Sequence, residues 1–194
     1  MQIKTLALAG VLLSTVGCGP GTFTLAGWIV SPTDPNYKAT FGGVMVAKDT
    51  NGNGTVATNG PNNSAVFEEG DTFRGQFQFV DHGPGGARFH AVITGGYVAP
   101  PGGSGVVFAG RPKFSFLESS AYFEGTYTPI PRTLGPGGNF EVMIFDDKAA
   151  PFIQVDQLWI YLDGGVFDGY SNSVFPYTEA TKTGGGSVTF HPEK

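Results

Sequence analysis

Hydrophobic and polar residues alternate along much of the chain, and the longest alternating run outside the N-terminus lies at 155–163. Its side chains fall on two faces: Leu158, Ile160 and Leu162 on one, and Gln157, Trp159 and Tyr161 on the other. A period of two predicts a β-strand, and the glycine pair that follows predicts a hairpin turn. Because both faces carry large apolar groups, we expect a central strand that is covered on both sides.

The same pattern recurs in shorter stretches separated by turn residues. It predicts further strands at 22–30, 39–47, 72–81, 87–94, 106–109, 113–117, 120–128, 139–146 and 184–191, with a short extended segment at 97–98. The pair Gly42-Gly43 inside the second strand suggests a β-bulge or a close approach of backbones. No stretch after the N-terminus shows helical periodicity. The sequence therefore predicts an all-β fold: a single-domain antiparallel β-sandwich or barrel of about ten short strands.

Composition refines this picture. Glycine and proline make up about a quarter of the 194 residues, a proportion that is also found in low-complexity chains. Here, however, 17 phenylalanines and the alternating runs lie between them, which favours a turn-rich folded domain. Charged residues are sparse and the formal net charge is −5, so the chain lacks the basic character of a nucleic-acid-binding protein.

The N-terminus has the features of an export signal. Lys4 supplies a positive charge, and the apolar run from Leu6 to Val16 is too short to span a bilayer. Small residues, Thr15 and Gly17, precede Cys18. We therefore expect a signal peptide at 1–17, a short tether at 18–21 and the β-domain at 22–194.

Cys18 is the only cysteine of the chain, so no disulfide can form within it. Its position at the expected cleavage point resembles a bacterial lipobox, although Thr15 stands where a leucine-like residue is usual. This favours lipidation of Cys18, attachment to a membrane through the lipid, and a location at the outer membrane or cell surface. The alternative is ordinary cleavage next to a chance cysteine, which would make the protein a secreted one.

Several short segments occur in a characteristic order: 27–29, 38–42, 75–81, 89–91, 125–127, 138–146, 155–163 and 184–191. This series resembles the post-COAP family of bacterial secreted β-domains, which often stand at the C-terminus of exported proteins. The resemblance implies an extracytoplasmic β-domain and brings no catalytic residues with it. The chain departs from the family at 158–161, where a charged Arg-x-Lys pattern is usual, and at 167–169, where Tyr-Asp-Asn is favoured.

A calcium-type pattern occurs at Asp49-x-Asn51-x-Asn53-Gly54, with oxygen ligands at alternate positions followed by glycine. In an EF-hand the twelfth position supplies a bidentate glutamate, but that position here is Gly60, and strands rather than helices flank the loop. Either the loop is a hairpin turn with Asn-Gly chemistry, the interpretation we favour, or Asp71 or Glu69 completes a calcium site. Calcium is the one cofactor that the sequence suggests.

Aspartates gather at the ends of predicted strands: Asp146, Asp147, Asp163 and Asp168. If these ends meet in space, the carboxylates could hold a cation. We favour the more common role, in which such side chains accept hydrogen bonds from nearby backbone N–H groups in turns.

The sequence assigns no catalytic residue. Ser104 lies in a Pro-Gly loop rather than a nucleophile elbow, and the histidines His82, His90 and His191 lack metal-ligand spacing. We expect His90 and His191 to point outward from strands. Glu118, Glu124 and Glu141 could serve glycoside hydrolysis only at a suitable separation, and we expect Glu124 and Glu141 to be exposed to solvent.

Aromatic residues offer a binding surface. Trp28, Trp159 and Tyr161, together with Tyr97, could stack on sugar rings or contact a peptide, although packing between two sheets is the interpretation we favour. We expect an envelope β-domain with a non-enzymatic binding or structural role, whose partner is a glycan or another envelope protein. The alternatives are a carbohydrate-active hydrolase that uses strand-end carboxylates and a calcium-stabilised adhesion-type module.

Overall fold

The protein is a single curled antiparallel sheet. The computed structural model describes residues 21–52, 71–99, 119–146, 156–173 and 181–192. Its strands are β1 (Gly21–Val30), β2 (Lys38–Lys48), β3 (Thr72–Asp81), β4 (Arg88–Ala99), β5 (Ser119–Pro129), β6 (Gly138–Asp146), β7 (Gln157–Asp163), β8 (Thr181–Lys182) and β9 (Gly185–Pro192). Two 3-10 turns, η1 (Arg132–Leu134) and η3 (Gly165–Phe167), follow β5 and β7. The strand order is β8-β7-β6-β5-β4-β3-β2-β1-β9, and the predicted all-β class is confirmed.

The predicted strands match these elements closely, with three qualifications. The strands expected at 106–109 and 113–117 lie outside the described residues, as do the signal peptide and the tether up to residue 20. Gly21, expected in the tether, already pairs with Ala47 and Pro192 as the first residue of β1. The break expected at Gly95-Gly96 is instead a register shift within one continuous strand.

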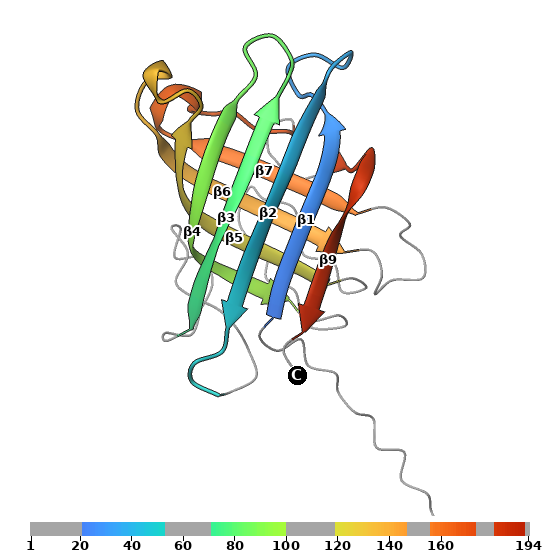
Figure 1. The fold of residues 1–194 in the computed structure, drawn as a ribbon, viewed down its shortest axis with the longest axis vertical. Helices are drawn as coiled ribbons and strands as arrows, with labels where there is room; N and C mark the ends of the chain where they lie inside the picture. Colours follow the sequence, from blue (N-terminus) through green and yellow to red (C-terminus); the bar gives the residue numbers. More distant parts are fainter. Residues whose placement is uncertain (1–20, 53–70, 100–118, 147–155, 174–180, 193–194) are drawn as a thin grey trace, which may run out of the picture.

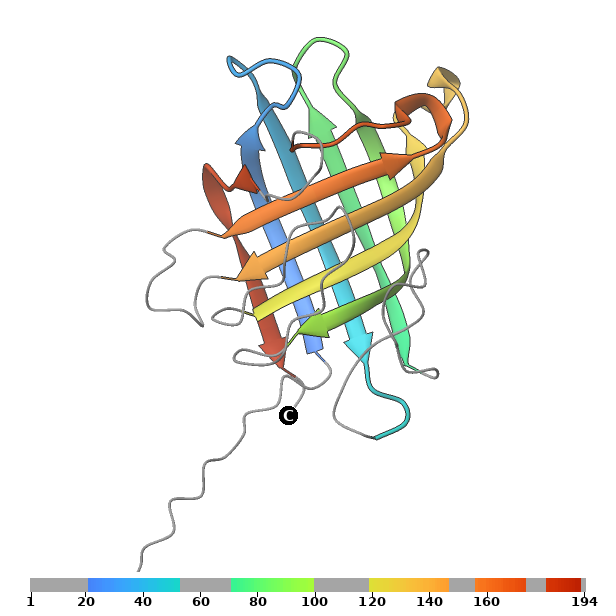
Figure 2. The same cartoon turned by 180° about the vertical axis from the view of Figure 1, so that it is seen from behind.

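The sheet folds over itself into two crossing layers (Figure 1). The front layer consists of β9, β1, β2, β3 and the first half of β4, and the back layer consists of the rest of β4 with β5, β6, β7 and β8. Figure 2 shows β5, β6 and β7 running obliquely across the front strands. β4 passes from one layer to the other at the irregularity between Ile93 and Gly95, which is consistent with the bending that a bulge produces.

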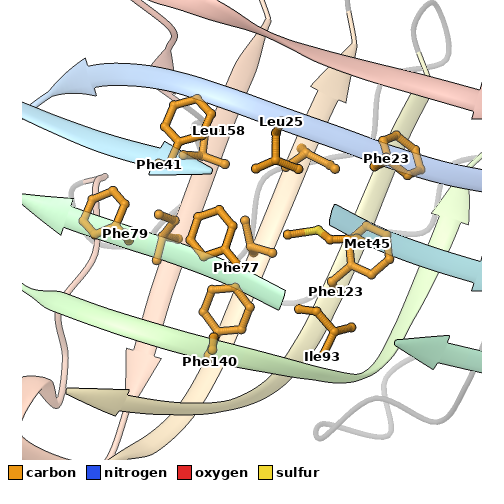
Figure 3. Packing of buried hydrophobic residues seen from close by; sticks show 14 of the residues in the cluster. Phe23, Leu25, Phe41, Met45, Phe77, Phe79, Ile93, Phe123, Phe140 and Leu158 are labelled. Atoms are coloured by element: carbon orange, nitrogen blue, oxygen red, sulfur yellow. The ribbon is translucent and has the colours of Figure 1, made fainter. Parts of the chain in front are cut away.

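The core lies between the layers and is rich in phenylalanine (Figure 3). Phe77 of the front layer stacks on Phe140 of the back layer with ring centroids 5.2 Å apart, and Phe23 meets Phe123 edge to face at 5.7 Å. All four of these phenylalanines are fully buried. Burial of each such side chain contributes about 1.5–3 kcal/mol, so the inward phenylalanines hold the two layers together.

The prediction of a central strand at 155–163 is half right. Leu158, Ile160 and Leu162 are fully buried in the core, and Trp159 on the opposite face is fully buried as well, so both faces are covered. In the strand order, however, β7 pairs on one side only with the two-residue β8, so it lies next to the end of the sheet. Apolar residues on both faces of a strand indicate that other groups cover both faces. They do not indicate where the strand lies in the order of the sheet.

Buried aspartates attach the last strand of the front layer to the back layer. The backbone N–H of Phe190 in β9 donates to Asp146 Oδ2 at the end of β6 (2.8 Å), and that of Val188 donates to Asp156 Oδ2 just before β7. Both carboxylates are nearly inaccessible to solvent. Side-chain hydrogen bonds therefore join β9 to the back layer where the sheet has no strand ladder.

Candidate functional site

A shallow groove of about 720 Å³ lies on the outward surface of β2, β3 and β4. Its walls combine valines with long polar side chains. The lining residues are Gly42, Gly43, Val44, Val46, Arg74, Gly75, Gln76, Phe77, Gln78, His90, Val92 and Ile93. None of these lining residues carries a carboxylate, although the chain as a whole is acidic.

The groove is open because Gly42 has no side chain at an outward position. A Cβ atom added at Gly42 would meet only the carbonyl oxygen of Leu25, at 3.8 Å, so neither packing nor backbone conformation requires glycine there. Gly43 differs, because its Cβ would lie 2.6 Å from the backbone oxygen of Gln76. Of the two glycines, only Gly43 is needed for a close approach of two backbones. The register through both residues is regular, so the suggested bulge is absent.

Strand β3 supplies the polar row of the groove. Arg74, Gln76 and Gln78 alternate with buried phenylalanines, so all three point outward at intervals of about 7 Å. Their cross-strand neighbours complete the walls. Val46 lies opposite Arg74, Val44 and Val92 lie on either side of Gln76, and Gly42 and His90 lie on either side of Gln78.

These polar groups are available to a ligand. Within the described residues, the side chains of Arg74, Gln76, Gln78 and His90 make no hydrogen bond or ion pair. The three β3 side chains are exposed and His90 is half-buried. Val44 and Val92 are 49% and 47% exposed, respectively, so apolar surface lies on both sides of the row. The sequence contained the Arg-x-Gln-x-Gln alternation, but the juxtaposition with Gly42 and His90 depends on strand register.

The predicted aromatic residues do not form one surface. Trp159 is fully buried on the outward side of the back layer, where its cross-strand neighbour Met143 is also fully buried. Tyr161 is half-buried and stacks beside Trp159, with ring centroids 6.2 Å apart. Trp28 belongs to the front layer, and the Nζ atom of Lys38 lies 3.9 Å above its ring. The prediction that Trp159 contributes to an aromatic binding surface is therefore wrong, because its side chain is fully buried, and Trp28 lies on the other layer.

Two glutamates are neighbours on the outward side of the back layer. Glu141 lies opposite Glu124 on one side and Tyr161 on the other, and the Tyr122 hydroxyl donates to Glu124 Oε2 at 2.8 Å. The expectation that both glutamates are exposed is wrong for Glu141, which is only 6% accessible and shares its face of β6 with the fully buried Met143, and Glu124 is half-buried. A pair of carboxylates does not by itself assign catalysis, because the separation of the two groups decides the chemistry.

The loop at Asp49 adopts turn chemistry in its described part. Asp49 Oδ1 accepts hydrogen bonds from the backbone N–H groups of Asn51 (3.1 Å) and Gly52 (2.6 Å). Asp71 Oδ1 accepts the N–H of Thr50 at 3.1 Å, which brings a second carboxylate to the same hairpin. Asn53 lies outside the described residues, and no group of three or more metal-ligating side chains occurs in the part of the chain that the structure covers. The calcium site therefore stays a prediction.

The strand-end aspartates serve separate local contacts. Asp168 Oδ1 accepts the N–H of Gly164 at 2.8 Å, as the turn interpretation predicts, and Asp163 meets the Asn139 side chain at 3.4 Å. Asp146 binds the backbone of β9 as described above, and Asp147 lies outside the described residues. Asp146 is the last residue of β6, whereas Asp163 pairs with Asn139 at the other end of that strand, so these carboxylates do not meet in one site.

The histidines point outward, as expected for His90 and His191. His191 Nε2 lies 3.1 Å from Thr24 Oγ1, and His82 Nε2 lies 3.4 Å from Thr40 Oγ1. None of the three makes a hydrogen bond to another histidine in the described structure. Of the three, only His90 lines the groove.

A buried carboxylate that the sequence pattern did not single out lies at one end of the fold. Asp81 is fully buried and accepts hydrogen bonds from the Gly83 N–H (2.8 Å), the Tyr170 hydroxyl (2.9 Å) and Thr33 Oγ1 (3.1 Å). Burial, and then the charge and hydrogen bond of Asp81, raise the pKa of Tyr170. The Asp-x-Gly spacing at 81–83 is the sequence signal for this turn. Its saturated contacts indicate a structural role.

Comparison of the chain with protein-family models, curated proteins and solved structures gave no match. The resemblance to the post-COAP domains therefore stays a prediction. Among the described residues, no helix has the length and apolar character needed to cross a membrane.

Proposed function

We propose that this protein is a non-enzymatic binding domain of the cell envelope, exported and anchored through a lipid on Cys18, and that the groove on β2–β4 is its binding site. The observation that carries the proposal is the open floor at Gly42, beside four polar side chains that have no partner within the described residues. A surface whose side chains packed against one another would leave neither space for a ligand nor polar groups free to bind it.

A glycan is the ligand class that suits this groove. The amides of Gln76 and Gln78 can both donate and accept hydrogen bonds, which matches the dual character of sugar hydroxyls. Val44 and Val92 offer apolar surface for the C–H face of a sugar ring. Apolar walls with a few placed polar groups are typical of small-ligand sites.

The test fills the groove without altering the core. In the full chain carrying Cys18→Ser for solubility, Gly42→Ile places a β-branched side chain on the groove floor, where the backbone tolerates a Cβ. Thr72→Ile, at an exposed outward position of the same strand layer beyond the groove, is the matched control. We expect the parent to bind at least one glycan class on an array, Gly42→Ile to weaken that binding about tenfold or more by calorimetry, and Thr72→Ile to leave it unchanged.

Two results would overturn the groove as the site. One is a parent protein that binds no glycan. The other is a folded Gly42→Ile variant, with an unchanged melting temperature, that binds as tightly as the parent.

A further inference from the structure

The outward face of the front layer is basic, in contrast to the whole chain. Its strands place four cations at outward positions: Lys38, Lys48, Arg74 and Arg88. Within the described residues, no Asp or Glu occupies an outward position on β1, β2, β3, β9 or the first half of β4, since Asp81 at the end of β3 points into the core. The formal net charge of the whole chain is −5, so the charge of these described strands is opposite in sign to that of the chain.

The described residues do not neutralise the positive charges of this face. In the described part of the chain, the side chains of Lys48, Arg74 and Arg88 make no ion pair or hydrogen bond. Lys38 lies over the ring of Trp28, a contact that leaves its charge in place. An anionic partner would therefore gain attraction without having to displace an internal carboxylate.

The cations stand at the two ends of the layer, with the groove between them. Lys38 and Lys48 are the first and last residues of β2, about 34 Å apart along an extended strand. Arg88 lies opposite Val80 near the Lys38 end, and Arg74 lies opposite Val46 near the Lys48 end. A small anion could reach only one end, whereas an extended polymer lying along β2 and β3 would meet both.

We propose that this face binds a carboxylate-bearing polysaccharide. The proposal rests on the groove being a glycan site, and it adds the charge and the direction of the ligand. The polymer lies along β2 and β3, with hydroxyls against Gln76 and Gln78 and carboxylates near Arg74 and Arg88. Charges separated by uncharged hydroxyl groups match a face on which uncharged amides separate the cations.

Paired substitutions test the charge contribution. Arg74→Gln with Arg88→Gln removes two outward charges whose side chains make no hydrogen bond or ion pair in the described structure, so the fold should be unaffected. Arg132→Gln with Lys182→Gln removes the same number of charges from exposed positions in η1 and β8, outside the strands of the front layer, and is the matched control for net charge. Each variant is made in the full chain with Cys18→Ser, and its melting temperature is compared with that of the parent.

Polygalacturonate is the probe, with dextran as a neutral polymer and phosphatidylglycerol vesicles as an anionic membrane. We expect calorimetry to show binding to polygalacturonate that weakens as salt is raised. The Arg74/Arg88 variant should lose about tenfold or more in affinity, while the Arg132/Lys182 variant changes little.

The other outcomes overturn the proposal in distinguishable ways. Binding to dextran alone, abolished by Gly42→Ile, would keep the glycan site and remove the anionic ligand. Binding to the vesicles but not to polygalacturonate would replace the polysaccharide by a membrane surface. Equal losses in the Arg74/Arg88 variant and in the Arg132/Lys182 variant would indicate attraction by overall charge. Failure to bind any polymer would overturn both proposals.

Discussion

At the scale of single residues, the adjacent glycines Gly42 and Gly43 have opposite roles in one strand. Gly42 faces outward with open space above it, whereas Gly43 faces the core against the backbone of Gln76. The sequence predicts that such a pair accompanies a bulge or a close approach, but not which glycine the fold needs. That assignment requires the register of β2 against β3, because the backbone that crowds Gly43 is 33 residues further along the chain.

The two glycines should respond differently to alanine. Gly43→Ala forces a Cβ against a backbone oxygen and should lower the free energy of unfolding by about 1–3 kcal/mol. Gly42→Ala meets no obstacle and restricts the unfolded chain, so it should leave stability unchanged or raise it by up to about 1 kcal/mol. Urea unfolding of both variants checks this. Equal losses would contradict the proposed difference between the two positions.

At the scale of elements, β7 shows how side chains complete the edge of a strand whose neighbour, β8, pairs with only two of its residues. The Asn172 side chain accepts the N–H of Ile160 and donates to the carbonyl of Leu158, both at 2.7 Å, and Ser171 Oγ donates to the Ile160 carbonyl at 2.9 Å. Alternation predicted which residues of β7 enter the core. It could not predict the strand order, because a period of two specifies faces and says nothing about neighbours.

Removal of the Asn172 amide should therefore destabilise the edge of β7. Asn172 is nearly buried, so Asn172→Ala leaves one backbone N–H and one carbonyl without their partner away from water, at a cost of about 2 kcal/mol or more. Asn139→Ala, at an exposed site with one long contact of 3.4 Å, is the control and should change stability by less than about 0.5 kcal/mol. Thermal unfolding measures both, and faster hydrogen exchange at the Ile160 amide should accompany the loss. Equal stability of the two variants would show that the side chain is not needed.

At the scale of the whole molecule, the fold class followed from the sequence while the site did not. Phe73, Phe77 and Phe79 alternate with polar residues, and all three are buried as that pattern predicts. The groove is made by three strands whose outward residues are neighbours only in the folded sheet. The absence of carboxylates from the outward positions of the described front strands is visible only when the strands are placed side by side. Local alternation thus predicts which residues form the core. A surface site depends instead on the register between strands, and local sequence patterns specify that register only weakly.

The proposed membrane attachment belongs to the same scale, because it would set where the front face can meet a ligand. Two acyl chains on Cys18 would give stable anchoring, since each buried methylene contributes about 0.8 kcal/mol. Cys18→Ser should move the protein from the membrane fraction to the soluble fraction, and Gly19→Ser, one residue further on, should leave it membrane-bound. Fractionation and mass spectrometry of the mature N-terminus measure this, the latter through the added mass of the lipid. A wild-type protein that is soluble and unmodified at Cys18 would rule out the anchor, and the proposed glycan-binding face would then belong to a secreted protein.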